Sequence, residues 1–203
     1  MNAFTNIRQV VPRRTLLTGA TGFVGSAVAR CLIEHGFPLR LMYRSGADLA
    51  NIAGISAQRV VGDLCDTQSL RVALHGCDAV FHVAADYRLW VPRPHTIYRT
   101  NVEGSLALVR AAARAGVGRF IYTSSVATLY AGADDSVSDE NQPVGLADMV
   151  GHYKRSKFLA EVAVRQEAER LGMELITVNP STPVGPRDIK PTPTGKIIVD
   201  GAS

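Results

Sequence analysis

The sequence lacks several features that define particular classes of protein. Its three cysteines, Cys31, Cys65 and Cys77, form no CxxC pair and no cysteine–histidine group with metal-ligand spacing. We therefore expect no metal site, and reduced thiols in a cytoplasmic protein. No apolar run reaches the ~18–20 residues of a membrane-spanning helix. The 22 basic and 18 acidic residues leave a net charge of +4 that is scattered along the chain, which argues against a nucleic-acid partner.

The beginning of the chain also lacks a targeting pattern. Its first 14 residues contain arginines but no apolar stretch follows them, so we predict no secretory signal and interpret residues 1–14 as a short disordered arm. Disorder of the whole chain is excluded, because 46% of the residues are hydrophobic and 20% are charged, as in ordinary globular domains.

What the sequence does contain is an alternation of short apolar segments with longer helical patterns. The apolar segments predict strands at 15–18, 39–43, 59–61, 79–84, 120–123 and 175–178, and the periodic segments predict helices at 23–35, 66–74, 95–115 and 149–171. Asp66 is expected to cap the second helix. Repeated strand–helix units predict a doubly wound, parallel α/β sheet of the Rossmann type. The proline-rich residues after 180 are expected to be mostly loop, with the start of a helix near residue 197.

A glycine-rich turn lies where the first strand gives way to the first helix. Its GxxGxxG spacing places Gly19 for a tight turn, Gly22 for close approach of a pyrophosphate, and Gly25 for close packing of helix on strand. The first amides of the helix then face the anion. This position in an α/β pattern predicts a dinucleotide-binding turn. The predicted cofactor-binding residues of the turn are Gly19, Thr21, Gly22, Phe23, Val24 and Gly25.

The end of the second strand bears on the choice of cofactor. NAD-binding proteins commonly place an acidic residue there to hold the ribose 2′-hydroxyl, but this sequence has Arg44 followed by Ser45. An arginine can pair with a 2′-phosphate. We therefore predict NADP as the favoured cofactor, with NAD as the alternative. The competing interpretation of Arg44 is a solvated surface side chain.

A tyrosine and a lysine stand one helical turn apart on the helix that follows the fifth strand. A lysine ammonium beside the phenol of Tyr153 would favour its phenolate, so Tyr153 and Lys157 are predicted to perform acid–base chemistry. Hydroxyls at the end of the fifth strand lie at the carboxyl edge of the sheet, where open α/β folds bind ligands. Ser125 is our candidate for the third catalytic residue, and Ser124 is the competing assignment.

Together, the glycine turn and the serine, tyrosine and lysine resemble the short-chain dehydrogenase/reductase superfamily, in its extended, epimerase/dehydratase branch. Finer features, including the segments 148–158 and 179–195, resemble hopanoid-associated sugar epimerases and dihydroflavonol-4-reductase-like proteins. The resemblance implies a hydride transfer on a small, sugar-like substrate, by epimerisation or by reduction. A protein that binds NAD(P) without catalysis is the alternative.

The resemblance also implies roles for residues outside the turn and the triad. Residues 15–180 would form the NAD(P)-binding domain, and 181–203 the truncated start of a substrate-binding region that is largely missing. An uncovered sheet edge would then favour a homodimer. The residues that it adds to the cofactor site are Asp63, Leu64, Ala84, Asn101 and Pro180.

Two further side chains near these motifs have open interpretations. Trp90, in the loop 86–92, is equally consistent with surface packing and with substrate contact. His152 directly precedes the tyrosine, but a neighbouring helical residue points about 100° away, so we do not expect it to be catalytic.

Overall fold

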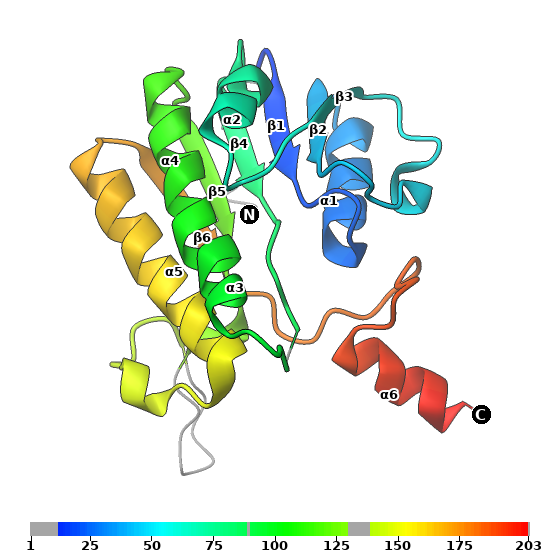
Figure 1. Ribbon diagram of the computed structural model, residues 1–203. Helices are drawn as coiled ribbons and strands as arrows, with labels where there is room; N and C mark the ends of the chain where they lie inside the picture. The colour runs from blue at the N-terminus through cyan, green and yellow to red at the C-terminus, as the bar shows by residue number, and fades with distance from the viewer. Residues whose placement is uncertain (1–11, 89, 130–138, 203) are drawn as a thin grey trace, which may run out of the picture.

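The computed structural model describes residues 12–88, 90–129 and 139–202. Six parallel strands form one sheet in the order β3-β2-β1-β4-β5-β6. This arrangement confirms the predicted doubly wound fold (Figure 1). The strands are β1 (Thr15–Thr18), β2 (Leu39–Tyr43), β3 (Gln58–Val61), β4 (Ala79–His82), β5 (Arg119–Thr123) and β6 (Glu174–Val178).

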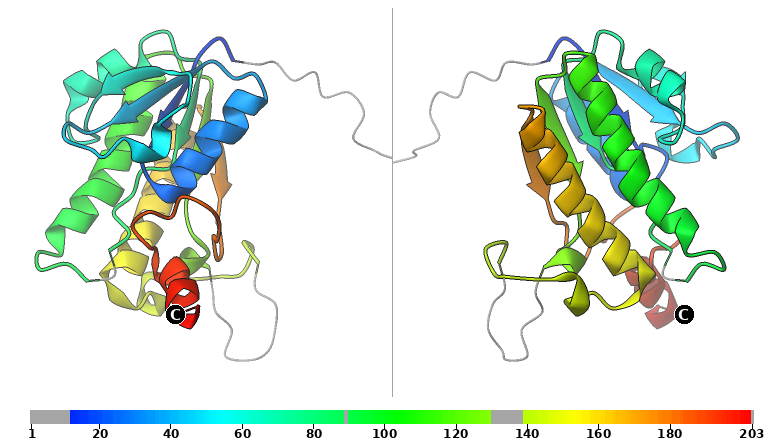
Figure 2. Two further views of the ribbon diagram at one scale, coloured as in Figure 1. Left: turned by 90° about the vertical axis from the view of Figure 1, so that its right-hand side faces the viewer. Right: turned by 60° about the vertical axis from the view of Figure 1, so that its left-hand side comes forward.

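Helices cover both faces of the sheet. Figure 2 shows α1 on the opposite side of the sheet from α4 and α5. The α-helices are α1 (Phe23–Glu34), α2 (Thr67–Leu74), α3 (His95–Tyr98), α4 (Gly104–Arg114), α5 (Gly151–Arg170) and α6 (Pro193–Gly201). Short 3-10 turns lie at η1 (Ala50–Ile52), η3 (Val126–Thr128) and η4 (Leu146–Asp148).

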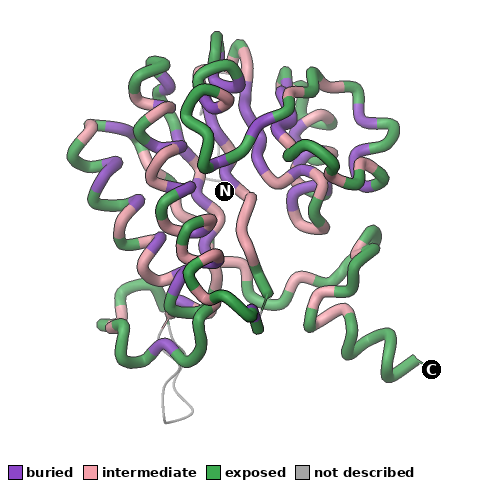
Figure 3. The backbone as a smooth tube through the Cα atoms, in the orientation of Figure 1, coloured by how far each residue is buried: buried purple, intermediate pink, exposed green. Residues whose placement is uncertain are grey.

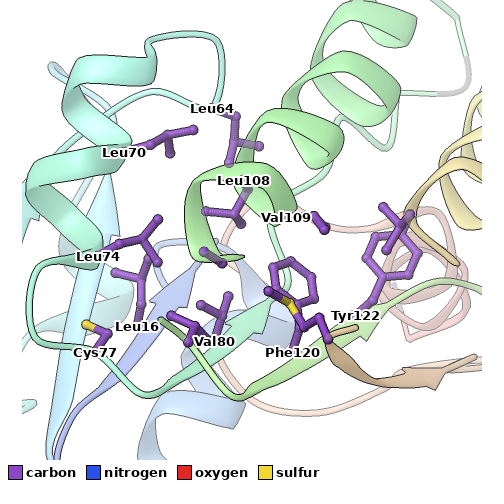
Figure 4. Packing of buried hydrophobic residues seen from close by; sticks show 14 of the residues in the cluster. Leu16, Leu64, Leu70, Leu74, Cys77, Val80, Leu108, Val109, Phe120 and Tyr122 are labelled. Carbon is purple, nitrogen blue, oxygen red and sulfur yellow. The ribbon is translucent and has the colours of Figure 1, made fainter. Parts of the chain in front are cut away.

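Alternating side chains of the strands feed two separate apolar clusters. In β1, Leu16 packs into the cluster beneath α2, α4 and α5, whereas its neighbour Leu17 packs into the cluster beneath α1. Figure 4 shows part of the first cluster, in which Leu108 of α4 lies near Phe120 of β5. Side chains alternate across a strand, and both faces of the central strands β1 and β4 are covered, so nearly all successive side chains of these two strands are buried.

The edge strand β6 is covered on one face. Leu175 packs against the cluster beneath α5, whereas Ile176 and Val178, which point to the other face, are each 41% exposed. In the part of the chain that the structure describes, α6 buries none of its residues, and Figure 3 shows it as an exposed helix below the sheet. One face of β6 is therefore uncovered in the described part of the chain.

The structure corrects three details of the sequence interpretation. The predicted helix 95–115 is interrupted by a π-helical turn, η2 (Arg99–Glu103), which periodicity alone does not reveal. The helix expected near residue 197 begins four residues earlier, as α6 at Pro193, after the expected loop. The backbone amides of Arg13 and Arg14 donate hydrogen bonds to Asp78, so these two residues are anchored and do not belong to a free arm. Residues 1–11 of that arm lie outside the described residues.

Asp66 caps α2 as predicted. Its Oδ1 accepts a hydrogen bond from the amide of Gln68 at 3.0 Å. The capped helix begins at the residue after it, and this placement brings the β3–α2 connection to the carboxyl edge of the sheet, where the site lies.

Candidate active site

The glycine turn that follows β1 has the close backbone packing that its spacing predicts. Gly19 has a φ of +79°, and a Cβ on it would lie 2.5 Å from the amide nitrogen of Ala84. A Cβ on Gly25 would collide with the carbonyl of Gly19. A Cβ on Gly22 would meet only the Gly19 carbonyl oxygen, at 3.4 Å, so the backbone of Gly22 is open to an approaching group at the N-terminus of α1. This geometry fits a pyrophosphate held on the first amides of the helix.

A buried polar contact supports the turn from below. The ring of His82, at the end of β4, contacts Thr18 Oγ1 through Nδ1 and Ser105 Oγ through Nε2, both at 2.8 Å. Thr18 Oγ1 also accepts a hydrogen bond from the amide of Ala84 at 3.3 Å. Burial, together with the nearby ammonium of Lys157, lowers the pKa of His82 to about 3, so the imidazole is neutral.

Arg44 and Asp63 line the same cavity. This cavity of about 500 Å³ lies at the carboxyl ends of β2 and β3, beside Ser45 and Ser69. Arg44 also contributes, after Arg88, to lowering the pKa of the Asp86 carboxyl. The positive charge of Arg44 therefore acts on Asp86 at the edge of the site. The structure thus brings together Arg44, predicted to pair with a 2′-phosphate, and Asp63, which the family resemblance adds to the cofactor site.

The side chain of Leu64 points the other way. The Leu64 side chain is buried in the cluster beneath α2 and α4 (Figure 4). It packs so closely on α4 that a Cβ on Gly104 would lie 2.8 Å from the Cβ of Leu64. Any contribution of Leu64 to the cofactor site therefore comes from its backbone.

Lys157 is anchored to the end of β5. Its side chain enters from α5, and Nζ donates hydrogen bonds to the Thr123 carbonyl at 2.9 Å and to Tyr122 Oη at 3.2 Å. Only 2% of the residue is exposed, and burial lowers its pKa to about 8. An ammonium carries three N–H groups. Two are used by β5, so the third remains for another partner, and Tyr153 lies one turn earlier on the same helix.

The two candidate serines at the end of β5 have different surroundings. Ser124 is buried, and its hydroxyl donates to the carboxylate of Glu161 on α5. Ser125 is half-buried, and its Oγ accepts the amide of Ala127 at 3.1 Å as the cap of η3. That bond leaves the hydroxyl hydrogen of Ser125 to be donated elsewhere.

Asn101 lies in the π-helical turn and is buried. Its Oδ1 accepts the amide of Asp86, and its Nδ2 donates to the Asp86 carbonyl and to Ser156 Oγ, at 2.7–2.9 Å. Ser156 in turn donates to the Tyr153 carbonyl at 2.8 Å. Asn101 therefore joins the loop after β4 to the helix that carries the tyrosine, and the π-helical turn directs its side chain inward.

The remaining candidates lie around the rim of the site. Pro180 accepts the amide of Val126 at 3.0 Å, which places it beside the serine turn. His152 is exposed and its Nδ1 contacts Tyr98 Oη at 3.1 Å. Trp90 is 78% exposed, so packing against the described residues does not explain why a tryptophan stands at this position. Beyond β6 the chain returns to the glycine turn, where Gly185 lies against Phe23.

Sequence reasoning missed the buried groups that support these residues. Glu161 belongs to no motif that we used. Tyr122 and His82 lie in strand ends that we considered, but we assigned them none of these supporting contacts. A signal was present for one of them, because Glu161 continues the spacing of Tyr153 and Lys157 by one further helical turn. Among the described residues, no group of His, Cys, Asp or Glu could hold a metal ion, and no helix is long and apolar enough to cross a membrane.

Comparison with known proteins places this site in a family. Residues 15–199 match the NAD dependent epimerase/dehydratase family, and the chain belongs to it. It is 42% identical over 183 residues to a putative dihydroflavonol 4-reductase from Synechocystis, covering 90% of this chain and 53% of that protein.

Two solved structures are also similar to the chain in sequence and in fold. The crystal structure of gox2253 is 54% identical with a TM-score of 0.89, covering 93% of this chain and 57% of that one. A short-chain dehydrogenase/reductase superfamily protein from Agrobacterium tumefaciens with bound NAD is 32% identical with a TM-score of 0.69, covering 82% and 48%. The chain thus spans about half the length of the curated relatives it matches. The match therefore assigns it to a family of NAD-dependent epimerases and dehydratases.

Proposed function

We propose that the protein is an NADPH-dependent ketone reductase of this family. The observation that carries the reductive direction is Arg44 on the cavity at the end of β2, where its guanidinium can pair with a 2′-phosphate. The name of the Synechocystis relative, a putative dihydroflavonol 4-reductase, supports the same direction.

The residues that would hold the cofactor are those of the glycine turn for the pyrophosphate, and Arg44 with Asp63 for the adenosine end. The cofactor, when bound, supplies the hydride that is added to the carbonyl carbon of the substrate. The carbon–oxygen double bond becomes a carbon–hydrogen and an oxygen–hydrogen single bond, so one proton is also required.

Tyr153 would supply that proton from its phenol to the carbonyl oxygen. Lys157, one turn away with its third N–H available, would stabilise the phenolate that remains. Ser125 would donate its hydroxyl hydrogen to the same carbonyl oxygen. We prefer Ser125 to Ser124, because the hydroxyl of Ser124 is already committed to Glu161.

Epimerisation of a sugar-like substrate uses the same residues, and the narrower resemblance to hopanoid-associated sugar epimerases stays a prediction. The two reactions differ in their cofactor balance. A reductase consumes one NADPH for each product molecule, whereas an epimerase returns the hydride to its substrate and consumes none.

The test has two stages. The chain is first titrated with NADPH and NADH by nicotinamide fluorescence, and then supplied with NADPH and a panel containing a dihydroflavonol, simple aryl ketones and a nucleotide sugar. Saturable binding that favours NADPH, with NADPH oxidation dependent on a ketone, is the expected result. Binding without ketone-dependent oxidation, together with a change in the nucleotide sugar, would identify an epimerase instead. Binding without any turnover would favour the non-catalytic alternative.

A further inference from the structure

Glu161 lies on α5 one turn after Lys157, and the reaction described above gives it no role. Its side chain is 12% exposed. The Oε2 atom accepts hydrogen bonds from Ser124 Oγ, from Thr128 Oγ1 at 2.9 Å and from Asn179 Nδ2 at 3.2 Å. These three donors come from the end of β5, from η3 and from the residue after β6. One carboxylate oxygen therefore ties three segments to α5.

The segments that Glu161 joins enclose Ser125. The carbonyl of Ser125 accepts hydrogen bonds from Thr128 Oγ1 at 2.8 Å and from Asn179 Nδ2 at 3.1 Å. The two N–H groups of Asn179 can serve this carbonyl and Glu161 together, whereas the single hydroxyl hydrogen of Thr128 is shared between the two acceptors. The carboxylate therefore orients the groups that hold the backbone of the serine. Loss of the carboxylate would leave these buried donors without their shared acceptor.

The carboxylate of Glu161 also acts electrostatically on the ammonium of Lys157. The lysine bonds to the carbonyl of Thr123, and Glu161 bonds to the side chain of the next residue, Ser124. Opposite charges that are both shielded from water favour each other's charged form. The carboxylate of Glu161 raises the pKa of Lys157, against burial, which lowers it.

Among the residues that the structure describes, the other groups that act on the lysine carry no compensating negative charge. Tyr122 faces it from β5, and Tyr153 precedes it by one turn on α5. From β4 the neutral His82 lies close enough for its pKa to be lowered by the ammonium.

We propose that Glu161 is a positioning residue of the reaction site: its carboxylate holds the strand end that carries Ser125 and stabilises the buried ammonium of Lys157. It acts through its neighbours, with no contact to substrate. Its catalytic meaning rests on the proposed function, whereas its effects on Lys157 and Ser125 are properties of the folded chain and can be measured without substrate or cofactor.

The charge is tested by titrating Lys157 in chains labelled with ¹³C at the lysine ε-carbon. Glu161→Gln keeps an acceptor oxygen but removes the charge, and Lys157→Arg identifies the signal among those of Lys154, Lys190 and Lys196. We expect the midpoint of the Lys157 titration to fall by about one pH unit in Glu161→Gln. In the control Arg165→Gln, which removes the exposed partner of Glu161 at 2.7 Å, the midpoint should not fall. An equal midpoint in wild type and Glu161→Gln would overturn the electrostatic part of the proposal.

We call the hydrogen bonds of Glu161 to Ser124, Thr128 and Asn179 the clamp. The clamp is tested by amide hydrogen exchange in Glu161→Ala and Glu161→Gln. Exchange at Val126 and Ala127 should be at least tenfold faster in the alanine variant, while strands distant from the clamp, such as β2, remain protected. Acceleration that is uniform over the sheet, or absent at these amides, would overturn the positioning claim. If the alanine variant does not fold, Glu161→Gln decides, because its smaller local acceleration at the same amides is the expected result. A wild-type chain that turns over no ketone would reject the proposed function and leave both measurements unaffected.

Discussion

The imidazole Nδ1 of His82 lies 2.8 Å from Oγ1 of Thr18, at the point where β4 and β1 end side by side. The same threonine oxygen accepts the amide of Ala84, the residue against which Gly19 packs. A neutral histidine inside the sheet therefore forms part of the floor of the cofactor turn. Its protonation would place an uncompensated charge in the core.

His82 should make stability fall at mildly acidic pH. Burial holds its pKa near 3 in the folded chain, against 6.5 as its ordinary value, so below pH 6.5 the unfolded chain binds a proton that the folded chain excludes. Stability from this group is present above pH 6.5 and is lost as the pH falls toward 3. Between pH 7 and pH 5, wild type should lose about 2 kcal/mol more of its free energy of unfolding than His82→Gln, as measured in urea.

His95 provides the matched control for this comparison, because it is an exposed histidine at the start of α3. His95→Gln should follow the wild-type dependence on pH. If His82→Gln loses as much stability as wild type between pH 7 and pH 5, the imidazole is not held neutral by the fold.

The glycine turn should separate stability from cofactor affinity. Gly25→Ala adds a methyl group that collides with the Gly19 carbonyl, so we expect a loss of about 1–3 kcal/mol of unfolding free energy. Gly22→Ala has room within the fold, but its methyl group points to where the pyrophosphate approaches. Unfolding in urea should leave Gly22→Ala close to wild type, while fluorescence titration shows weaker NADPH binding. Unchanged NADPH affinity in Gly22→Ala would mean that the pyrophosphate lies elsewhere.

Arg44 should set the preference between the two nicotinamide cofactors. Arg44→Asp removes the partner of a 2′-phosphate and offers a carboxylate to the ribose 2′-hydroxyl. The ratio of NADPH to NADH affinity should fall roughly 10- to 100-fold, since hydrogen bonds to charged groups contribute about 1.5–3 kcal/mol. Arg59→Asp, a change of the same charge on β3, serves as the control and should leave the ratio near its wild-type value. A ratio that Arg44→Asp does not change would make this arginine a surface side chain.

The strand and helix order could be predicted from the sequence because its causes are local. Apolar runs such as 39–43 coincide with buried strands, and Asp66 caps α2 through its own neighbour two residues on. The π-helical turn around Asn101 was not predictable, because it replaces a regular helix with one that differs by a single residue in register. The anchoring of Arg13 and Arg14 to Asp78 depends on a contact across more than sixty positions.

The candidate site was predictable to the same extent. Motif spacing located the glycine turn, Arg44 and Tyr153, because each occupies a fixed place relative to a strand end. The choice between Ser124 and Ser125 could not be made from sequence, since both are hydroxyls at one strand end. It depends on the partner that α5 presents, which is Glu161 for Ser124.

The central claim is that Tyr153 donates the proton in a reduction by NADPH, and Tyr153→Phe tests it most directly. Removal of one hydroxyl should lower ketone-dependent NADPH oxidation by at least about 100-fold, a loss expected for a general acid. The NADPH affinity, measured by nicotinamide fluorescence in the same samples, should stay within about twofold of wild type. Turnover that persists at the wild-type rate in Tyr153→Phe would contradict the account.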